Sequence, residues 1–489
     1  MTQISRGKKV CTTLPLLCML VLVSGCTVGP DFKQPELSAV MQDTWQATSG
    51  GSEQLDRFRQ PETDWWRQFH DDALTRLVSR LHASSLALAQ ARERIVEITA
   101  RQGIVKADKR LQLAAALGYT RAETGDEAVS LQGIPPGKTL DVYSAGVVAG
   151  WEFDVWGRVA RLLEAGEEDI RVGYAGYQDM MVSLSAELTL AYIEARTLDA
   201  RLEKVRENID LQRKTLGLAQ SRFEAGNGSE LEVVRTKQLL SSTRSQLPEL
   251  ERGLAVARNR INVLLGVPPK ERVLYPGPLP TVPPLIGIGL PLDLITRRPD
   301  IRQALHLYHS AVARIGAVEA EKYPALSLSG TLTLSSDSLG GVFDTDSLIY
   351  TLGPKLRFPI LTGNRIESNI AVRTSQAEQA RLGLEQQILS ALSEVENAAT
   401  GVVRSQQRTA ELKDAETFAQ KSVALSDELY RSGLGDLYQV LDNQRQLVAI
   451  QESLLLARQK ALSEVVYLYR ALGGGWENQA QQQGLEPNQ

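Results

Sequence analysis

The chain carries two copies of one long unit, and this repeat limits the folds open to it. A shift of 207 residues places Trp151 on Phe358, Arg158 on Arg365 and Gly266 on Gly473, and no gap is needed between these positions. A repeat of this length indicates two copies of a large supersecondary unit rather than a solenoid of short modules.

Each copy contains a segment that is predicted to form one very long helix. Residues 156–225 and 366–432 contain no proline, and their apolar side chains recur at alternating steps of four and three residues. This heptad spacing is typical of coiled coils. About 70 residues at about 1.5 Å each give a rod of about 100 Å, so such helices must lie side by side. The apolar positions are Leu184, Leu188, Ala191, Ala195, Leu198, Leu202, Val205 and Ile209 in the first copy, and Ile388, Leu392, Val395, Ala399 and Val402 in the second.

Shorter helices are predicted on both sides of each rod. One helix precedes each rod, and a glycine turn with a return helix follows it. Two short helices placed end to end match one rod, so each copy is expected to supply an antiparallel coiled-coil pair. The preceding helices are residues 72–110 and 299–322, repeat 1 is 72–267, the proline-rich connector is 268–291 and repeat 2 is 292–473.

The hydrophobic period changes to two between the first helix and the rod of each copy. Hairpins are predicted at about residues 113–153 and 326–358, with apolar and polar side chains alternating over about ten residues per strand. This alternation is typical of transmembrane β-barrels, and a soluble sheet packed on a helix is the alternative.

Four such strands cannot close a barrel around a pore. Unpaired strand edges are costly in hydrocarbon, and the eight strands of two chains would form a barrel whose side chains fill its interior. Three chains give twelve strands. The sequence therefore predicts an α+β membrane protein, a trimer with a 12-stranded β-barrel and a matching ring of long coiled-coil helices.

The N-terminus is predicted to be a signal peptide followed by a lipid anchor. Residues 1–25 combine basic residues with an apolar run that is too short to span a bilayer. Cys26 follows small residues in a lipobox, and Thr27 does not provide the aspartate that retains lipoproteins at the inner membrane. We expect residues 26–71 to form a lipidated segment at the outer membrane, and residues 474–489 to be a disordered tail.

Composition argues against other classes of function. The net charge is −4, and a nucleic-acid partner usually requires a basic face. No cysteine or third clustered ligand completes a metal site around the four histidines, His70, His82, His306 and His309. No glycine run follows a strand as a phosphate loop does. The chain is therefore predicted not to be an enzyme, and to have no cofactor beyond the covalent lipid on Cys26.

Several motifs resemble those of the outer membrane factors of the TolC and OprM type, especially the lipoprotein branch that serves resistance-nodulation-division (RND) multidrug efflux. The resemblance covers nearly the whole mature chain, although Arg110 and its neighbours replace a proline that often precedes the first strand. The matching stretches are residues 26–32, 65–69, 151–158, 290–291, 297–301, 323–324, 353–354 and 359–360.

This resemblance implies a trimeric channel, in which the 12-stranded outer-membrane β-barrel is continued by a long periplasmic α-helical coiled-coil barrel. Such a channel would be a passive exit duct for drugs or other small molecules. Its implied partners are two further copies of the chain, outer-membrane lipid, a periplasmic adaptor protein and an inner-membrane RND-type transporter. An outlet for a type I protein secretion system is the alternative within the same class, and a coiled-coil lipoprotein without a pore is a further one.

Two functional regions are predicted near the ends of the rods. The adaptor-docking tips comprise Gly226, Gly228 and Ser229 in repeat 1 and Gly433, Gly435 and Asp436 in repeat 2. Glycines allow tight reversals, and small exposed residues would let adaptor hairpins approach the backbone.

A periplasmic gate is predicted just beyond the second tip. The resemblance assigns Asp442 to a constriction, with Arg445 at the spacing of the OprM type, and Tyr430 to a tie between neighbouring helices. The alternative for Asp442 and Arg445 is an ordinary solvated pair worth about 0.2–0.5 kcal/mol.

Overall fold

The computed structural model describes residues 27–36, 44–46, 55–126, 137–274 and 276–477. Residues 1–25, Cys26 and residues 478–489 lie outside the described residues, and so do the predictions made for them. Contacts divide the chain into two compact units. Unit 1 comprises residues 1–35, 95–172 and 305–383, and unit 2 comprises residues 36–94, 173–304 and 384–489.

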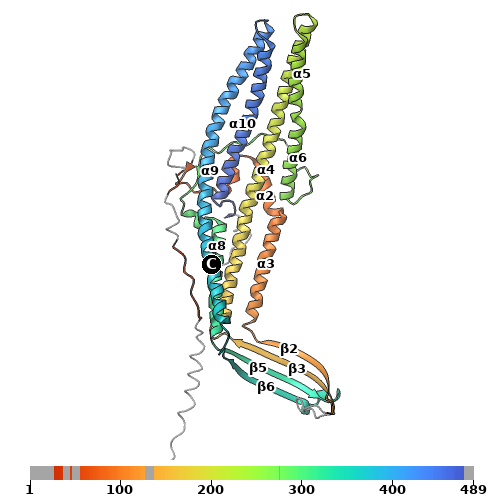
Figure 1. Cartoon of the computed structure of the whole chain (residues 1–489), viewed down its shortest axis with the longest axis vertical. Helices are drawn as coiled ribbons and strands as arrows, with labels where there is room; N and C mark the ends of the chain where they lie inside the picture. The colour runs from red at the N-terminus through yellow and green to blue at the C-terminus, as the bar shows by residue number, and fades with distance from the viewer. Residues whose placement is uncertain (1–26, 37–43, 47–54, 127–136, 275, 478–489) are drawn as a thin grey trace, which may run out of the picture. The chain divides into compact units, whose positions relative to one another are not determined.

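A four-stranded antiparallel sheet forms part of unit 1. Its strands lie side by side in the order β2 (Gln112–Glu123), β3 (Thr139–Phe153), β5 (Ala325–Ser336) and β6 (Leu348–Arg357) (Figure 1). Strands β2 and β6 are the two edges, and neither has a second partner among the described strands. The first strand of this sheet, β2, begins at Gln112, although no proline precedes it.

The register of the sheet gathers the alternating apolar side chains on one face. Val147 is opposite Ala115 on β2 and Leu332 on β5, and Leu332 is opposite Tyr350 on β6. This face is exposed, with Leu117 at 87%, Tyr350 at 77% and Leu352 at 75%. Mostly small and polar side chains occupy the other face, where the hydroxyls of Thr331 and Thr351 lie 2.6 Å apart.

Helices account for most of the remaining described chain. The two rods are α4 (Arg158–Glu224) and α9 (Arg365–Arg431), each of 67 residues. The other helices are α2 (Asp72–Ser84), α3 (Leu86–Ala107), α5 (Glu230–Arg244), α6 (Gln246–Leu264), α7 (Asp293–Arg297), α8 (Pro299–Glu319) and α10 (Leu437–Ala471). Short 3-10 turns are η2 (Trp65–Phe69), η3 (Ala320–Lys322), η4 (Gly341–Phe343) and η5 (Thr345–Ser347).

No helix among the described residues is both long enough and apolar enough to cross a membrane.

Two predicted helices are each split in two. The helix expected over residues 72–110 breaks at Ser85, whose backbone is extended, and ends at Ala107. The first return helix breaks at Ser245. Pro248 explains this second break, because it has no N–H to donate to the carbonyl of Arg244.

Unit 2 contains an aromatic core near the end of the connector. Trp65 stacks on Tyr469 with ring centroids 5.3 Å apart, and Trp66 and Phe69 are buried beside them. The strands β1 (Leu55–Asp56) and β4 (Ile286–Gly287) pair in parallel, so the connector is not wholly without regular structure. Residues 474–477, which were predicted to belong to the tail, lie against the fold, where Trp476 is only 8% exposed.

A short N-terminal segment, residues 27–32, is fastened to α4 and α8 within unit 1. We call it the strap. Arg161 reaches the carbonyls of Val28 and Gly29 and the carboxylate of Asp31, the last at 2.6 Å. The Phe32 ring stacks on His309 at 4.1 Å. A side chain on Gly316 would collide with the strap backbone, since its Cβ would lie 2.7 Å from the Val28 carbonyl oxygen.

Candidate functional site

The two predicted tips have the same backbone hydrogen bonds. At the end of α4, Asn227 N donates to Arg222 O at 2.8 Å and Gly226 N to Phe223 O at 3.0 Å. At the end of α9, Leu434 N donates to Leu429 O at 2.9 Å and Gly433 N to Tyr430 O at 3.1 Å. This is the Schellman pattern that closes a helix C-terminus. Figure 1 shows the two turns at the same end of unit 2.

The four tip glycines meet two different requirements of these turns. Gly226 and Gly433 have φ of +74° and +76°, which side chains rarely tolerate. Gly228 and Gly435 lie against their own turns, since a Cβ on Gly435 would be 2.9 Å from Leu429 Cβ. The turns themselves therefore account for all four glycines, whether or not another protein docks there.

Ser229 and Asp436 each begin the helix that leaves a tip. The Ser229 side chain accepts from Glu232 N at 3.3 Å, and the Asp436 carboxylate accepts from Tyr438 N at 3.0 Å. Both are N-caps, which satisfy otherwise unpaired N–H groups. Both residues are exposed.

Tyr430 joins the two tips to each other. It is 2% exposed, and its hydroxyl donates to Glu232 Oε2 on α5 at 3.4 Å. The Arg222 guanidinium lies over the Tyr430 ring at 4.6 Å and donates to its carbonyl at 2.7 Å. Burial is the main cause that raises the pKa of Tyr430, so the hydroxyl keeps its proton at neutral pH. Apolar side chains surround the ring, namely Ala219, Val233, Leu437, Val440 and Leu441.

Asp442 and Arg445 form an ion pair on the outer face of α10. Arg445 Nη1 lies 3.3 Å from Asp442 Oδ1, and Gln446 donates to the other carboxylate oxygen at 2.8 Å. The Arg445 side chain is 63% exposed. No hydrogen bond, ion pair or ring contact among the described residues joins this pair to Tyr430, so the tertiary structure of one chain does not unite the three predicted gate residues.

Sequence reasoning missed the partners of Tyr430. Arg222 and Glu232 come from repeat 1, about 200 residues earlier, and their side chains carry no local motif. Arg235 adds a second link between the tips, because its guanidinium lies 5.8 Å from the centre of the Tyr438 ring. Only the packing of α4 and α5 beside α9 and α10 reveals these contacts.

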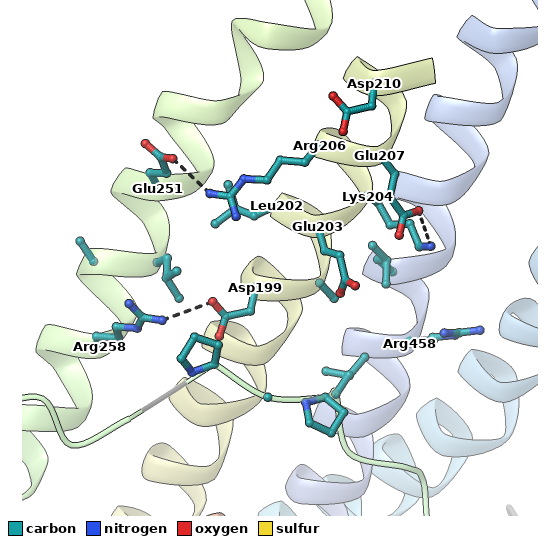
Figure 2. A pocket seen from close by; sticks show the side chains of 18 residues that line it. Asp199, Leu202, Glu203, Lys204, Arg206, Glu207, Asp210, Glu251, Arg258 and Arg458 are labelled. Carbon is teal, nitrogen blue, oxygen red and sulfur yellow. Dashed lines mark hydrogen bonds and ion pairs between the residues drawn. The ribbon is translucent and has the colours of Figure 1, made fainter. Parts of the chain in front are cut away.

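A cavity lies within unit 2, among α4, α6, α10 and the connector. Its volume is about 1220 Å³. Figure 2 shows charged side chains around it that pair with each other: Asp199 with Arg258, Arg206 with Glu251 and Lys204 with Glu207. Burial raises the pKa of Asp199 despite its arginine partner. Because these charged side chains pair with each other, the cavity does not indicate a particular ligand.

Three of the four histidines pack within the fold or bond to carboxylates, and His70 is exposed. His82 is 5% exposed and shares a 2.8 Å hydrogen bond with Ser185. His306 lies 2.6 Å from Glu168, and His309 lies 3.2 Å from Glu164. Among the described residues, no group of three or more His, Cys, Asp or Glu side chains is placed to hold a metal ion.

Comparisons with known proteins agree with this architecture. Residues 77–267 and 290–474 match a family model described as outer membrane efflux protein. Nodulation protein T of Rhizobium leguminosarum bv. trifolii is 29% identical over 467 residues, which cover 93% of this chain and 96% of that protein. The toluene efflux pump outer membrane protein TtgF of Pseudomonas putida is 27% identical, with 94% and 96% covered. The solved structure of the outer-membrane channel OprN superposes with a TM-score of 0.85 at 28% identity, covering 92% of this chain and all of that one.

Proposed function

The chain belongs to the family of outer membrane efflux proteins, and from that premise we propose how it forms an exit duct. It is a channel component in the outer membrane that extends into the periplasm, and its role is transport rather than catalysis. The relatives support efflux over protein export by a type I secretion system. We propose that it passes drugs or other small molecules that an inner-membrane RND-type transporter and a periplasmic adaptor deliver.

The sheet of unit 1 is the observation that carries the proposed assembly. It has one exposed apolar face and two edges that lack a second partner among the described strands. Each unpaired backbone group would cost several kcal/mol in hydrocarbon. Three chains, each pairing its β6 with β2 of the next chain, would close a 12-stranded barrel. The apolar face would then face lipid and the face that carries Thr331 would face the pore. The rods α4 and α9 would continue the duct as a barrel of helices.

Mass and conductance of the purified protein test this assembly. We expect a detergent-solubilised complex with the mass of three chains and discrete conductance steps in planar lipid bilayers. A complex of another size would contradict the twelve strands. A trimer that never conducts would contradict the duct.

The strap supports the proposed lipid anchor on Cys26. A side chain on Gly157 would lie 2.9 Å from Thr27 Cα, so the residue after Cys26 is close to the point where β3 leads into α4. Trp156 and Tyr323 stack there at 4.6 Å. Trp and Tyr are enriched where membranes meet water, so acyl chains on Cys26 would enter the same boundary of the outer membrane.

The tips are the proposed docking surface for the adaptor. Gly226, Ser229, Gly433 and Asp436 are all exposed, and Leu434 between the second pair of glycines is 81% exposed. Three chains would present six similar tips. Adaptor hairpins fitting between them would contact backbone at the glycines and apolar surface at Leu434.

The gate is proposed to lie just beyond the second tip, at Tyr430, Asp442 and Arg445. An open duct would leak, so its closing contacts should be polar enough to separate when an adaptor binds. Asp442 and Arg445 are accessible to neighbouring chains, whereas Tyr430 holds the second tip against the first. In this proposal the exposed pair closes the duct and Tyr430 fixes the helices that carry it.

A further inference from the structure

The face of α4 that meets α10 is polar over two helical turns. Asn208, Gln212 and Thr215 are 6%, 1% and 3% exposed. They follow each other at steps of four and three residues, which is the spacing of core positions in a coiled coil. Such positions are normally apolar, so three buried polar side chains in succession require an explanation.

Two side-chain hydrogen bonds cross from this face to α10. Asn208 Nδ2 donates to Gln451 Oε1 at 2.9 Å, and Gln444 Nε2 donates to Thr215 Oγ1 at 2.9 Å. The two bonded positions are seven residues apart on each helix. Their order along α4 is the reverse of their order along α10. Both bonds therefore belong to a single antiparallel register, and any sliding of α10 along α4 would break both together.

Gln212 lies between these bonds and has no hydrogen-bond partner among the described residues at either amide atom. The shared register brings it opposite Leu447, which cannot bond to an amide. The side-chain oxygen of Gln444, Oε1, also has no hydrogen-bond partner among the described residues. A buried polar atom without a partner weakens the packing around it, so this layer holds α10 less firmly than an apolar layer would.

Apolar contacts join the helices nearer the tip, where Ala219 packs with Val440 and Leu441. A cavity of about 20 Å³ lies on the other side, lined in part by Asn208, Gln246 and Gln451. That volume admits a single water molecule. The polar layer can thus be hydrated from this side without disturbing the apolar cluster around Tyr430.

We propose that Asn208, Gln212, Thr215, Gln444 and Gln451, which we call the amide seam, position the gate and form the layer at which α10 separates from α4 when the duct opens. Gln444 lies between Asp442 and Arg445 in sequence, and its side chain points into the seam while theirs point outward. Polar side chains at core positions specify register at a cost in stability. The two crossing bonds hold α10 in the closed position. The unpartnered amide of Gln212 lowers the free energy needed for α10 to leave that position. This inference rests on the gate proposed above.

Two variants of the full-length channel in planar bilayers test the seam in opposite directions. Gln212→Leu replaces the unpartnered amide with an apolar side chain, and we expect open probability to fall about tenfold, equivalent to about 1.4 kcal/mol. Gln444→Ala removes a crossing bond, and we expect open probability to rise by a similar factor. Thr243→Val is the matched control, because Thr243 is 3% exposed but bonds only within α5, to Leu239 O.

Spin labels at Lys214 on α4 and Ala449 on α10, both exposed, separate the seam from the gate. Gln212→Leu should narrow the distribution of distances between the labels and Gln444→Ala should broaden it, whereas Thr243→Val should leave it unchanged. Wild-type distances and wild-type opening in both seam variants would overturn the inference. If the seam variants alter the distances but Asp442→Ala/Arg445→Ala leaves conductance unchanged, the seam positions α10 and the gate assignment is wrong.

Discussion

Gly433 and Gly435 are close in sequence, yet different physical constraints exclude side chains at the two positions. Gly433 has open space around it but a φ of +76°, whereas a Cβ on Gly435 would lie 3.1 Å from the Tyr430 backbone nitrogen. The first constraint concerns backbone conformation and the second concerns space. The same division separates Gly226 from Gly228, which is why the repeat preserves both glycines of each tip.

Alanine substitutions should therefore destabilise the second tip. Gly433→Ala forces a side chain into the left-handed region, and we expect a loss of about 1–2 kcal/mol. Gly217→Ala is the matched control, because Gly217 is on α4 with nothing within 4 Å of its Cβ position; there alanine should stabilise the helix by roughly 0.5–1 kcal/mol. Thermal unfolding of the purified channel measures both, and equal shifts for the two variants would contradict the turn geometry.

The gate pair can be removed without harming the fold. Because Arg445 is exposed, Asp442 is half-exposed and the two are one turn apart, Asp442→Ala/Arg445→Ala should cost only about 0.2–0.5 kcal/mol of helix stability. Under the gate proposal, conductance and sensitivity to large antibiotics should nevertheless rise. Asp210→Ala/Arg213→Ala removes an equivalent exposed pair from α4 and should change neither. If the two double variants showed the same conductance and the same antibiotic sensitivity, Asp442 and Arg445 would be an ordinary surface pair.

Among the elements, the four-stranded sheet has the most specific requirement for its surroundings, because its two faces differ in polarity. Leu352 and Thr351 are neighbours on β6 but lie on opposite faces, and the Thr351 hydroxyl shares a side-chain hydrogen bond with Thr331 on β5. A membrane barrel would expose Leu352 to lipid and Thr351 to the pore. The two positions therefore distinguish a barrel from a soluble sheet.

Leu352→Arg should reduce insertion into the outer membrane, because an arginine facing lipid near the midplane costs about 2–4 kcal/mol. Thr351→Arg would place the same charge on the face that already carries Lys355, so the protein should insert and show altered conductance. Membrane fractionation and bilayer recordings measure the two effects. Normal insertion of the Leu352 variant would show that this face does not meet lipid.

For the molecule as a whole, His82 links folding to pH. Burial lowers the pKa of His82 from 6.5 to about 4, and its Nδ1 has no hydrogen-bond partner among the described residues. Protonation would leave a buried N–H unsatisfied. The unfolded chain binds this proton more readily than the folded chain, so stability is retained above pH 6.5 and decreases as the pH falls toward 4.

This histidine should contribute roughly 3 kcal/mol to the loss of stability over that interval. We expect the thermal midpoint of His82→Gln to depend less on pH between 6.5 and 4 than that of the wild type. His70→Asn serves as the control, since His70 is exposed and asparagine tolerates its positive φ. Parallel pH curves for wild type and His82→Gln would show that another group controls acid stability.

The predicted elements were correct where one periodicity continued without interruption. Heptads without proline located both 67-residue rods to within about two residues, and alternation located the strands. The breaks at Ser85 and Ser245 were missed, because the apolar stripe continues across each of them. The tip glycines could be identified from sequence since a turn is a local structure.

Sequence patterns alone were enough to predict the repeat, the long helices and the two-faced strands, and the family match identifies an outer membrane efflux channel. These depend on local periodicity and on motifs a few residues long. The packed fold is needed to show which distant side chains meet: Tyr430 with Glu232 and Arg222, Gln444 with Thr215, and Arg161 with the strap. Helical periodicity specifies the face on which a side chain lies but leaves open which helix covers that face, and only packing makes that choice.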